Sequence, residues 1–191
     1  MELHKLGVKL FVEPNPNIDL LDFITIFHRW IQTRALDEYP IDVADYSHVP
    51  DGPGIMLIAR EGNYAFDETG GRQGMVYYAK RPLDGDFPTR LTRIFKRTLQ
   101  VCQLLEGESA LKGRLRFLGN ELQIFANDRL LAPNNQITAT TLMPMLGDVL
   151  VTLFAGKAHT MDWEANPKER FSVIAKTPEP VSISELLNRL A

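Results

Sequence analysis

Hydrophobic and polar positions alternate along several short segments of the chain, and this period of two predicts β-strands. Alternation over residues 8–12 predicts a first strand, and the apolar run 55–59 predicts a buried one. Further strands are expected at 63–67 and 75–80, joined by a glycine-rich loop, and at 171–175. The strands are short and closely spaced, which favours antiparallel pairing.

Four other segments repeat their apolar residues at helical spacing. The expected helices are residues 18–34, capped by Asn17; a segment from Asp86 or Thr89 to Gly107; a segment from Thr138 or Thr140 to Phe154; and residues 183–190, opened by the Ser182–Glu185 capping-box pattern. In the third helix, Pro144 must lie in the first turn or kink the helix, because proline has no N–H to donate.

Residues 114–125 predict a β-hairpin. A two-residue turn at Gly119 and Asn120 would place Phe117 opposite Leu122 on one face of the hairpin. Glycine and asparagine are the residues that such turns favour, because both tolerate a positive φ.

These elements follow the order β-α-β-β-β-α-β-β-α-β-α. The order predicts a single α+β domain over residues 1–191, with a mostly antiparallel mixed sheet and helices layered on one side. A chain of 191 residues is long enough to bury one substantial core.

Composition narrows the class of protein. The apolar fraction of 45% and the charged fraction of 24% are those of a globular domain. A net charge of −3 provides no general attraction to nucleic acid or to anionic membranes. The one cysteine, Cys102, excludes an intramolecular disulfide and multi-cysteine zinc sites, and is interpreted as a small buried hydrophobe.

Targeting signals are not evident. The first residues lack the apolar core of a secretory signal, and the apolar-rich stretch 142–156 is shorter than the roughly 20 residues that span a bilayer. A soluble cytoplasmic protein is therefore expected. No catalytic elbow, phosphate-binding glycine motif or metal motif occurs, so no cofactor and no metal are predicted.

The densest group of polar side chains lies between Asp42 and Asp51, in a segment predicted to be a turn before the strand 55–59. The candidate site residues are Asp42, Asp45, Tyr46, His48 and Asp51. One interpretation is acid–base chemistry by His48 with Asp45 or Asp51. The other is a turn whose aspartates accept hydrogen bonds from their own backbone. The residue types fit both.

Two residues elsewhere are candidates for ligand binding. His28 falls on the apolar seam of the first predicted helix, where it could be a hydrogen-bonded core residue or could reach Asp42 or Asp45. Arg129 could clamp a carboxylate or phosphate, or could pair with its neighbour Asp128.

Three segments together resemble a family of uncharacterised bacterial proteins of about this length. The segments are residues 27–32, residues 42–54 and residues 127–133. The resemblance implies a bacterial, cytoplasmic, single-domain protein, and it brings no activity, cofactor or catalytic residue.

Three functions compete. A small-molecule-binding or protein-interaction module is favoured, because the strong catalytic motifs are missing. The first alternative is a hydrolase or lyase that uses His48 with Asp45 or Asp51. The second is a nucleic-acid-associated protein that uses a basic stripe on the second helix, although the acidic chain does not favour it. The stripe comprises Arg90, Arg93, Lys96 and Arg97. A small molecule, a protein or a second copy of the chain are the partners that the sequence allows, and no membrane is expected.

Overall fold

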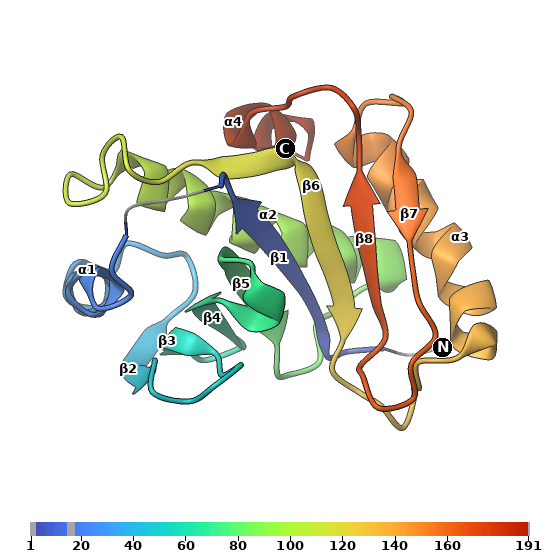
Figure 1. The fold of residues 1–191 in the computed structure, drawn as a ribbon, viewed down its shortest axis with the longest axis horizontal. Coiled ribbons are helices and arrows are strands. Elements are labelled where there is room, and N and C mark those ends of the chain that lie inside the picture. Colours follow the sequence, from blue (N-terminus) through green and yellow to red (C-terminus); the bar gives the residue numbers. More distant parts are fainter. Residues whose placement is uncertain (1–2, 15–17, 191) are drawn as a thin grey trace.

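The computed structural model describes residues 3–14 and 18–190, which form one open sheet and four α-helices (Figure 1). The strands are β1 (Leu6–Val12), β2 (Pro40–Tyr46), β3 (Gly54–Ala59), β4 (Gly62–Asp67), β5 (Gly74–Ala79), β6 (Phe117–Ala126), β7 (Thr160–Asp162) and β8 (Ser172–Lys176). The α-helices are α1 (Asp22–Thr33), α2 (Phe87–Gly107), α3 (Gln136–Leu153) and α4 (Ile183–Arg189), and a 3₁₀ turn, η1, covers Thr69–Gly71. The strand order is β2-β3-β4-β5-β1-β6-β8-β7, and the neighbouring strands pair antiparallel. The predicted α+β class with a mostly antiparallel sheet is confirmed.

The helices pack on one face of the sheet, as predicted. α2 runs behind β1 and β5 in Figure 1, α1 contacts β2 and β3, and α4 contacts β6. Alternate residues of β1 (Leu6, Val8 and Leu10) join the buried side chains of all four helices in one hydrophobic core. This layered arrangement requires apolar residues at every second position of the strands and in a stripe along each helix.

The opposite face of the sheet carries a small apolar cluster of its own, formed by Ala65, Val76 and Phe125. Phe125 lies over Gly7, where an added Cβ would come within 2.3 Å of the ring. Arg170 covers the other side of the Phe125 ring, with its guanidinium carbon 3.6 Å from the ring centroid. Side chains rather than helices therefore exclude water from this face.

The first helix begins at Asp22, four residues later than residue 18, where it was predicted to start. The carboxylate of Asp19 accepts a hydrogen bond from the Leu21 N–H at 3.0 Å, so the preceding residues form a turn rather than a helix. The predicted capping residue, Asn17, lies outside the described residues.

The helical spacing of Leu20, Leu21, Ile24, Phe27 and Ile31 predicts the buried face of α1, but of these residues only Phe27 is fully buried. The buried residues of α1 are Phe23, Ile26, Phe27 and Trp30. Phe23 stacks on Phe66 of β4 with ring centroids 4.0 Å apart, which fixes the rotation of the helix. His28 consequently faces solvent, and its predicted place on the apolar seam is wrong.

Residues 42–46 belong to the edge strand β2, where a turn was predicted. Asp42 lies opposite Ile58 and Tyr46 opposite Gly54. Gly54, the first residue of β3, needs to be a glycine, because its φ is +60° and a Cβ there would come within 2.1 Å of the Phe66 carbonyl oxygen. The turn itself is confined to residues 47–53.

The predicted hairpin at Gly119 and Asn120 is wrong, because both residues lie inside the continuous strand β6. Phe117 is paired with Val12 of β1, and not with Leu122. A Cβ on Gly119 would come within 1.9 Å of the Val181 carbonyl oxygen. This glycine therefore permits close approach of another backbone segment rather than reversal of the chain.

Most other elements agree with the sequence. β3, β4, β5 and β8 fall within one or two residues of their predicted positions. Asp86 caps α2 by accepting a hydrogen bond from the Thr89 N–H at 3.0 Å. The capping box of Ser182 and Glu185 opens α4.

α3 and β7 depart from the prediction. The N-cap of α3 is Asn135, which accepts a hydrogen bond from the Thr138 N–H, so the helix begins before either predicted cap. Pro144 lies in its interior rather than in its first turn. The three-residue strand β7 at the far edge of the sheet was not predicted.

By length and composition, α3 is the one helix among the described residues that could cross a membrane. It nevertheless packs as a core helix, with Leu142, Leu146 and Leu150 buried in the common core. Core helices of soluble proteins have the same length and hydropathy, so these properties alone do not make α3 a membrane segment.

Candidate functional site

The β2–β3 turn caps its own backbone, as one of the two interpretations of the acidic segment predicts. The Asp45 carboxylate accepts hydrogen bonds from the hydroxyl of Ser47 at 2.6 Å and from its N–H at 2.8 Å. The hydroxyl bond is the main reason that the pKa of Asp45 lies below its usual value. Asp51 has a φ of +53°, which short polar residues tolerate better than others. Local hydrogen bonds thus account for the shape of the turn.

The five candidate residues of this segment do not converge on one point. Side chains alternate along β2, so Asp42 and Tyr46 point to one face of the strand and Asp45 points to the other. Asp45 is opposite Ile55, whose side chain points into the helix-side core. The acid–base pairing of His48 with Asp45 or Asp51 has no hydrogen bond to support it among the described residues, and it stays a prediction.

His28, His48 and Arg129 are all exposed. Within the described ranges, no side-chain hydrogen bond or ion pair joins these three residues to the predicted carboxylates. The same part of the chain contains no group of three or more His, Cys, Asp or Glu side chains that could hold a metal ion. The roles of His28, His48 and Arg129 at a functional site also stay predictions.

The predicted basic stripe of α2 is interrupted. Arg90 is buried, with only 6% of its surface exposed, and its Nη1 atom lies 3.1 Å from the Nδ1 atom of His4. Arg97 is ion-paired with Glu38 and Glu61. Only Arg93 and Lys96 of the stripe are therefore available to a partner.

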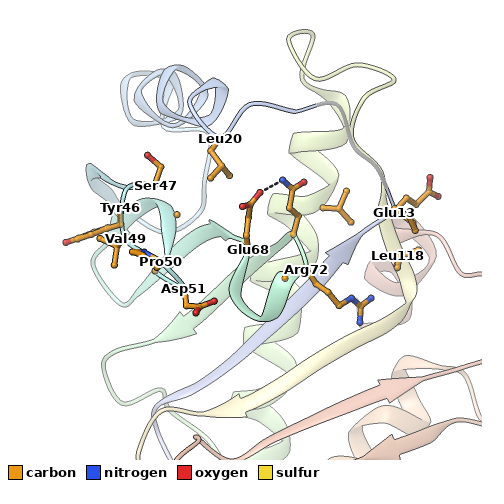
Figure 2. Close-up of a pocket in the computed structure, with 16 residues that line it drawn as sticks. Glu13, Leu20, Tyr46, Ser47, Val49, Pro50, Asp51, Glu68, Arg72 and Leu118 are labelled. Atoms are coloured by element: carbon orange, nitrogen blue, oxygen red, sulfur yellow. Dashed lines mark hydrogen bonds between the residues drawn. The ribbon is translucent and has the colours of Figure 1, made fainter.

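A cavity of about 710 Å³ lies beside the β2–β3 turn (Figure 2). We call it the turn cavity. It is lined by Val12, Glu13, Pro14, Leu20, Tyr46, Ser47, Val49, Pro50, Asp51, Gly52, Gly54, Glu68, Gly71, Arg72, Gln73 and Leu118. Leu20 and Glu68 point toward each other in Figure 2, whereas the Tyr46 ring points away. Of the predicted site residues, Tyr46 and Asp51 line this cavity, and Asp42, Asp45, His28, His48 and Arg129 do not.

The ionised groups of the turn cavity are mostly acidic. Its carboxylates are those of Glu13, Asp51 and Glu68, and its one cation is Arg72. The Arg72 guanidinium donates two hydrogen bonds to the Glu121 carboxylate, at 2.7 and 3.0 Å. Its central carbon lies 3.7 Å from the centroid of the Phe11 ring. Three carboxylates against one arginine give the described lining of the cavity a negative balance.

One polar atom in the wall of the turn cavity has no partner among residues 3–14 and 18–190. The Gln73 amide donates a hydrogen bond to the Glu68 carboxylate, but its own carbonyl oxygen is buried and accepts none. A buried acceptor without a donor costs free energy, so such atoms usually have a partner in the working protein.

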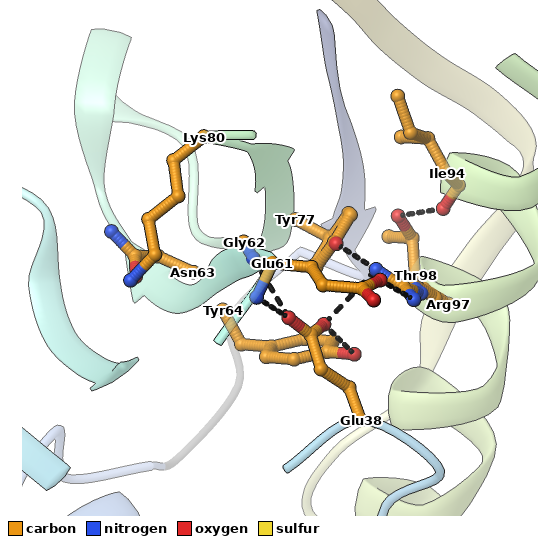
Figure 3. A network of polar contacts seen from close by, with 10 residues as sticks. All are labelled: Glu38, Glu61, Gly62, Asn63, Tyr64, Tyr77, Lys80, Ile94, Arg97 and Thr98. Carbon is orange, nitrogen blue, oxygen red and sulfur yellow. Dashed lines mark hydrogen bonds and ion pairs between the residues drawn. The ribbon is translucent and has the colours of Figure 1, made fainter. Parts of the chain in front are cut away.

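A buried polar network joins the β3–β4 turn to α2 (Figure 3). The Glu38 carboxylate accepts hydrogen bonds from the N–H groups of Glu61 and Gly62, at 2.5 and 2.7 Å, and from the Tyr64 hydroxyl at 3.2 Å. Burial, together with the nearby Glu38 carboxylate, raises the pKa of Tyr64 far above its usual value. Arg97 closes the network by donating to Glu61 and to the Tyr77 hydroxyl.

This network holds a loop in place. Glu38 is only 6% exposed and its oxygens are taken up by backbone and hydroxyl donors. Its geometry fits a structural tie between the α1–β2 loop and the β3–β4 turn. No local pattern predicts this role of Glu38, because Arg97 and Tyr77 lie far from it along the chain.

Comparison with known proteins adds no identity. The chain matches no protein-family model, no curated protein and no solved structure. Function must therefore be inferred from the geometry of the chain itself.

Proposed function

We propose that this protein binds a small organic molecule in the turn cavity. The observation that carries the proposal is the cavity itself. Its volume of about 710 Å³ falls within the roughly 300–1,000 Å³ typical of small-molecule sites. Its walls combine apolar side chains, among them Val12, Leu20 and Leu118, with a few polar groups. That combination gives a ligand both contact area and orientation.

The polar groups favour a ligand that donates hydrogen bonds. Three carboxylates line the cavity, and the Gln73 carbonyl oxygen is an acceptor without a partner. Arg72 is already paired with Glu121 and does not offset them. A molecule with an amine and an apolar part would satisfy these acceptors and also cover Leu20.

Titration calorimetry with spermidine, and with glucose as a neutral donor, tests the proposal. Glu68→Gln and Asp51→Asn keep the shape of each side chain and remove its charge, and asparagine tolerates the positive φ at position 51. Losing one charge-assisted hydrogen bond should weaken amine binding roughly tenfold. Asp42→Asn is the matched control, since Asp42 lies outside the cavity.

Two results would contradict the proposal. One is the lack of binding by either compound at millimolar concentration. The other is an equal loss of affinity in Asp42→Asn, which would attribute binding to the overall charge of the chain. Tighter binding of glucose than of spermidine would keep the cavity as a site and refute the amine.

A protein-interaction role is the second candidate, because the edge strand β2 is exposed. Ile41 on this strand is 55% exposed and Tyr39 beside it is 62% exposed. A partner could add a strand to this edge, and a second copy of the chain could do so symmetrically. Light scattering of wild type and Ile41→Lys would test self-association, with Leu130→Lys as a control at an exposed apolar residue outside β2. A monomer at every concentration would exclude the symmetric case.

A further inference from the structure

A second cavity collects three arginines at the other end of the same strands. This cavity, of about 340 Å³, is lined by Arg60, Glu61, Arg81, Pro82, Leu83, Asp84 and Arg93. We call it the arginine cavity. The turn cavity lies where β3 begins, and the arginine cavity lies where β3 ends. β3 is six residues long, so the two cavities are about 17 Å apart.

The three arginines come from three separate elements. Arg60 follows β3, Arg81 follows β5 and Arg93 lies on α2. Among the described residues, none of their side chains has an ion pair or a hydrogen bond to a carboxylate. All three arginines are exposed, and like charges that gather around one cavity repel one another, so an anion bound between them would be stabilised.

The carboxylates of the arginine cavity do not neutralise it. Glu61 is hydrogen-bonded to Arg97, and this bond is the main reason that the pKa of Glu61 lies below its usual value. Arg93 and Arg60 contribute to the same shift, which places both close to Glu61. Asp84 is then the one lining carboxylate without a described cation partner. The cavity therefore has a positive balance.

The backbone around this cavity is fixed. The Glu61 carbonyl accepts hydrogen bonds from the N–H groups of Lys80 and Arg81, at 2.9 and 3.2 Å, which ties the β3–β4 turn to the end of β5. Glu38 holds the same turn from below, through the N–H groups of Glu61 and Gly62 (Figure 3). Arg93 precedes the anchored Arg97 by one helical turn and lies on the same side of α2. The arginines thus project from a rigid frame.

We propose that the arginine cavity binds the phosphate group of a small phosphorylated molecule. Guanidinium groups match the geometry of phosphate oxygens and form paired hydrogen bonds with them. The volume exceeds that of a phosphate group, which leaves room for part of the molecule that carries it, and Leu83 and Pro82 offer apolar contact to that part. This site is independent of the turn cavity, which has the opposite charge.

The surroundings favour a small ligand over nucleic acid. The chain carries a net charge of −3, and Arg90 and Arg97 are not available to extend the positive surface along α2. Nucleic-acid binding requires contacts to many phosphates in a row. Three arginines around one cavity suit one or two phosphate groups.

The test is titration calorimetry of the full chain with inorganic pyrophosphate and inorganic phosphate. Wild type should bind pyrophosphate more tightly than phosphate. Arg60→Gln, Arg81→Gln and Arg93→Gln should each weaken binding roughly tenfold or more. Arg116→Gln, an exposed arginine outside the cavity, is the matched control and should leave binding unchanged. Without anion, the three cavity variants should melt at or above the wild-type temperature, because each removes like-charge repulsion.

Other outcomes would overturn the proposal. Lack of pyrophosphate binding at millimolar concentration would refute the site. An equal loss in Arg116→Gln would attribute binding to diffuse charge. Two further probes are a single-stranded oligonucleotide and vesicles containing phosphatidic acid. Binding to either of these alone, without binding to pyrophosphate, would identify a macromolecular or membrane phosphate and refute the small ligand.

Discussion

Lys9 and Asp67 form an ion pair on the face of the sheet opposite the four described helices. The two atoms, the Lys9 ammonium nitrogen and an Asp67 carboxylate oxygen, are 2.5 Å apart, and both side chains are buried. Burial lowers the pKa of Lys9, and the nearby Asp67 carboxylate opposes that shift. The ammonium also donates to the carbonyl oxygens of Thr69 and Arg72, at 3.2 and 2.7 Å. One side chain thereby fixes the β4–β5 loop, which forms a wall of the turn cavity.

The first prediction concerns this pair. Lys9→Met keeps the aliphatic stem but leaves Asp67 buried and unpaired, so it should lower the free energy of unfolding by about 3 kcal/mol. The double variant with Asp67→Asn removes the stranded charge as well and should recover part of the loss. Urea denaturation of the single and double variants measures the loss in free energy of unfolding and its recovery. A double variant less stable than the sum of the single changes would contradict the account.

The second prediction tests the unexpected geometry of β6. Gly119→Ala would place a methyl group within 1.9 Å of the Val181 carbonyl oxygen, so the strand and the segment before α4 must separate. We expect a loss of several kcal/mol, on the order of an overpacked core site. Gly107→Ala is the control, because a Cβ there meets nothing within 4 Å. If thermal melts of the two variants agree, the close approach at Gly119 is wrong.

Local signals explain which parts of the fold could be predicted. Asp86 before α2 and the Ser182–Glu185 box before α4 act within one helical turn, so the sequence alone reveals them. Gly119 and Asn120 have the composition of a turn, but a segment about sixty residues away determines their conformation. The turn predicted from residue propensity is wrong there, because a tertiary contact determines the local conformation.

The candidate sites were harder to predict for the same reason. The turn cavity combines Glu13, Glu68 and Leu118, which lie far apart in the sequence, with Tyr46 and Asp51 from the segment 42–51. The density of charged residues between Asp42 and Asp51 indicated a segment that lies beside the turn cavity. It could not indicate which of its side chains face the cavity, because that depends on the strand alternation of β2.

The third prediction separates a capping role of Asp45 from a binding role. Asp45→Asn keeps an oxygen that can accept from Ser47, so it should leave the melting temperature close to that of wild type. Asp45→Ala removes the acceptor and should lower the melting temperature measurably. His48→Ala should change little, since His48 is exposed. A strong loss of ligand binding in His48→Ala, with an unchanged melting temperature, would instead favour the acid–base or binding interpretation of the segment.

The last prediction is a pH dependence at Glu106. Burial raises the pKa of this carboxyl above its usual value, although its oxygen accepts a hydrogen bond from the Phe117 N–H at 2.8 Å. A raised folded-state pKa means that the folded protein binds more protons than the unfolded chain as the pH rises through the carboxyl range. The contribution of Glu106 to the free energy of unfolding should therefore decrease across that range.

Glu106→Gln isolates this effect, because glutamine keeps an acceptor for Phe117 and cannot ionise. The variant should match wild type in acid, where the glutamate is protonated in both states. It should become the more stable of the two as the pH rises above the usual glutamate pKa, and its advantage should level off above the raised pKa. Denaturation midpoints measured across this range give the comparison. A variant less stable than wild type at neutral pH would show that the ionised carboxylate, through its bond to Phe117, stabilises the fold despite its burial.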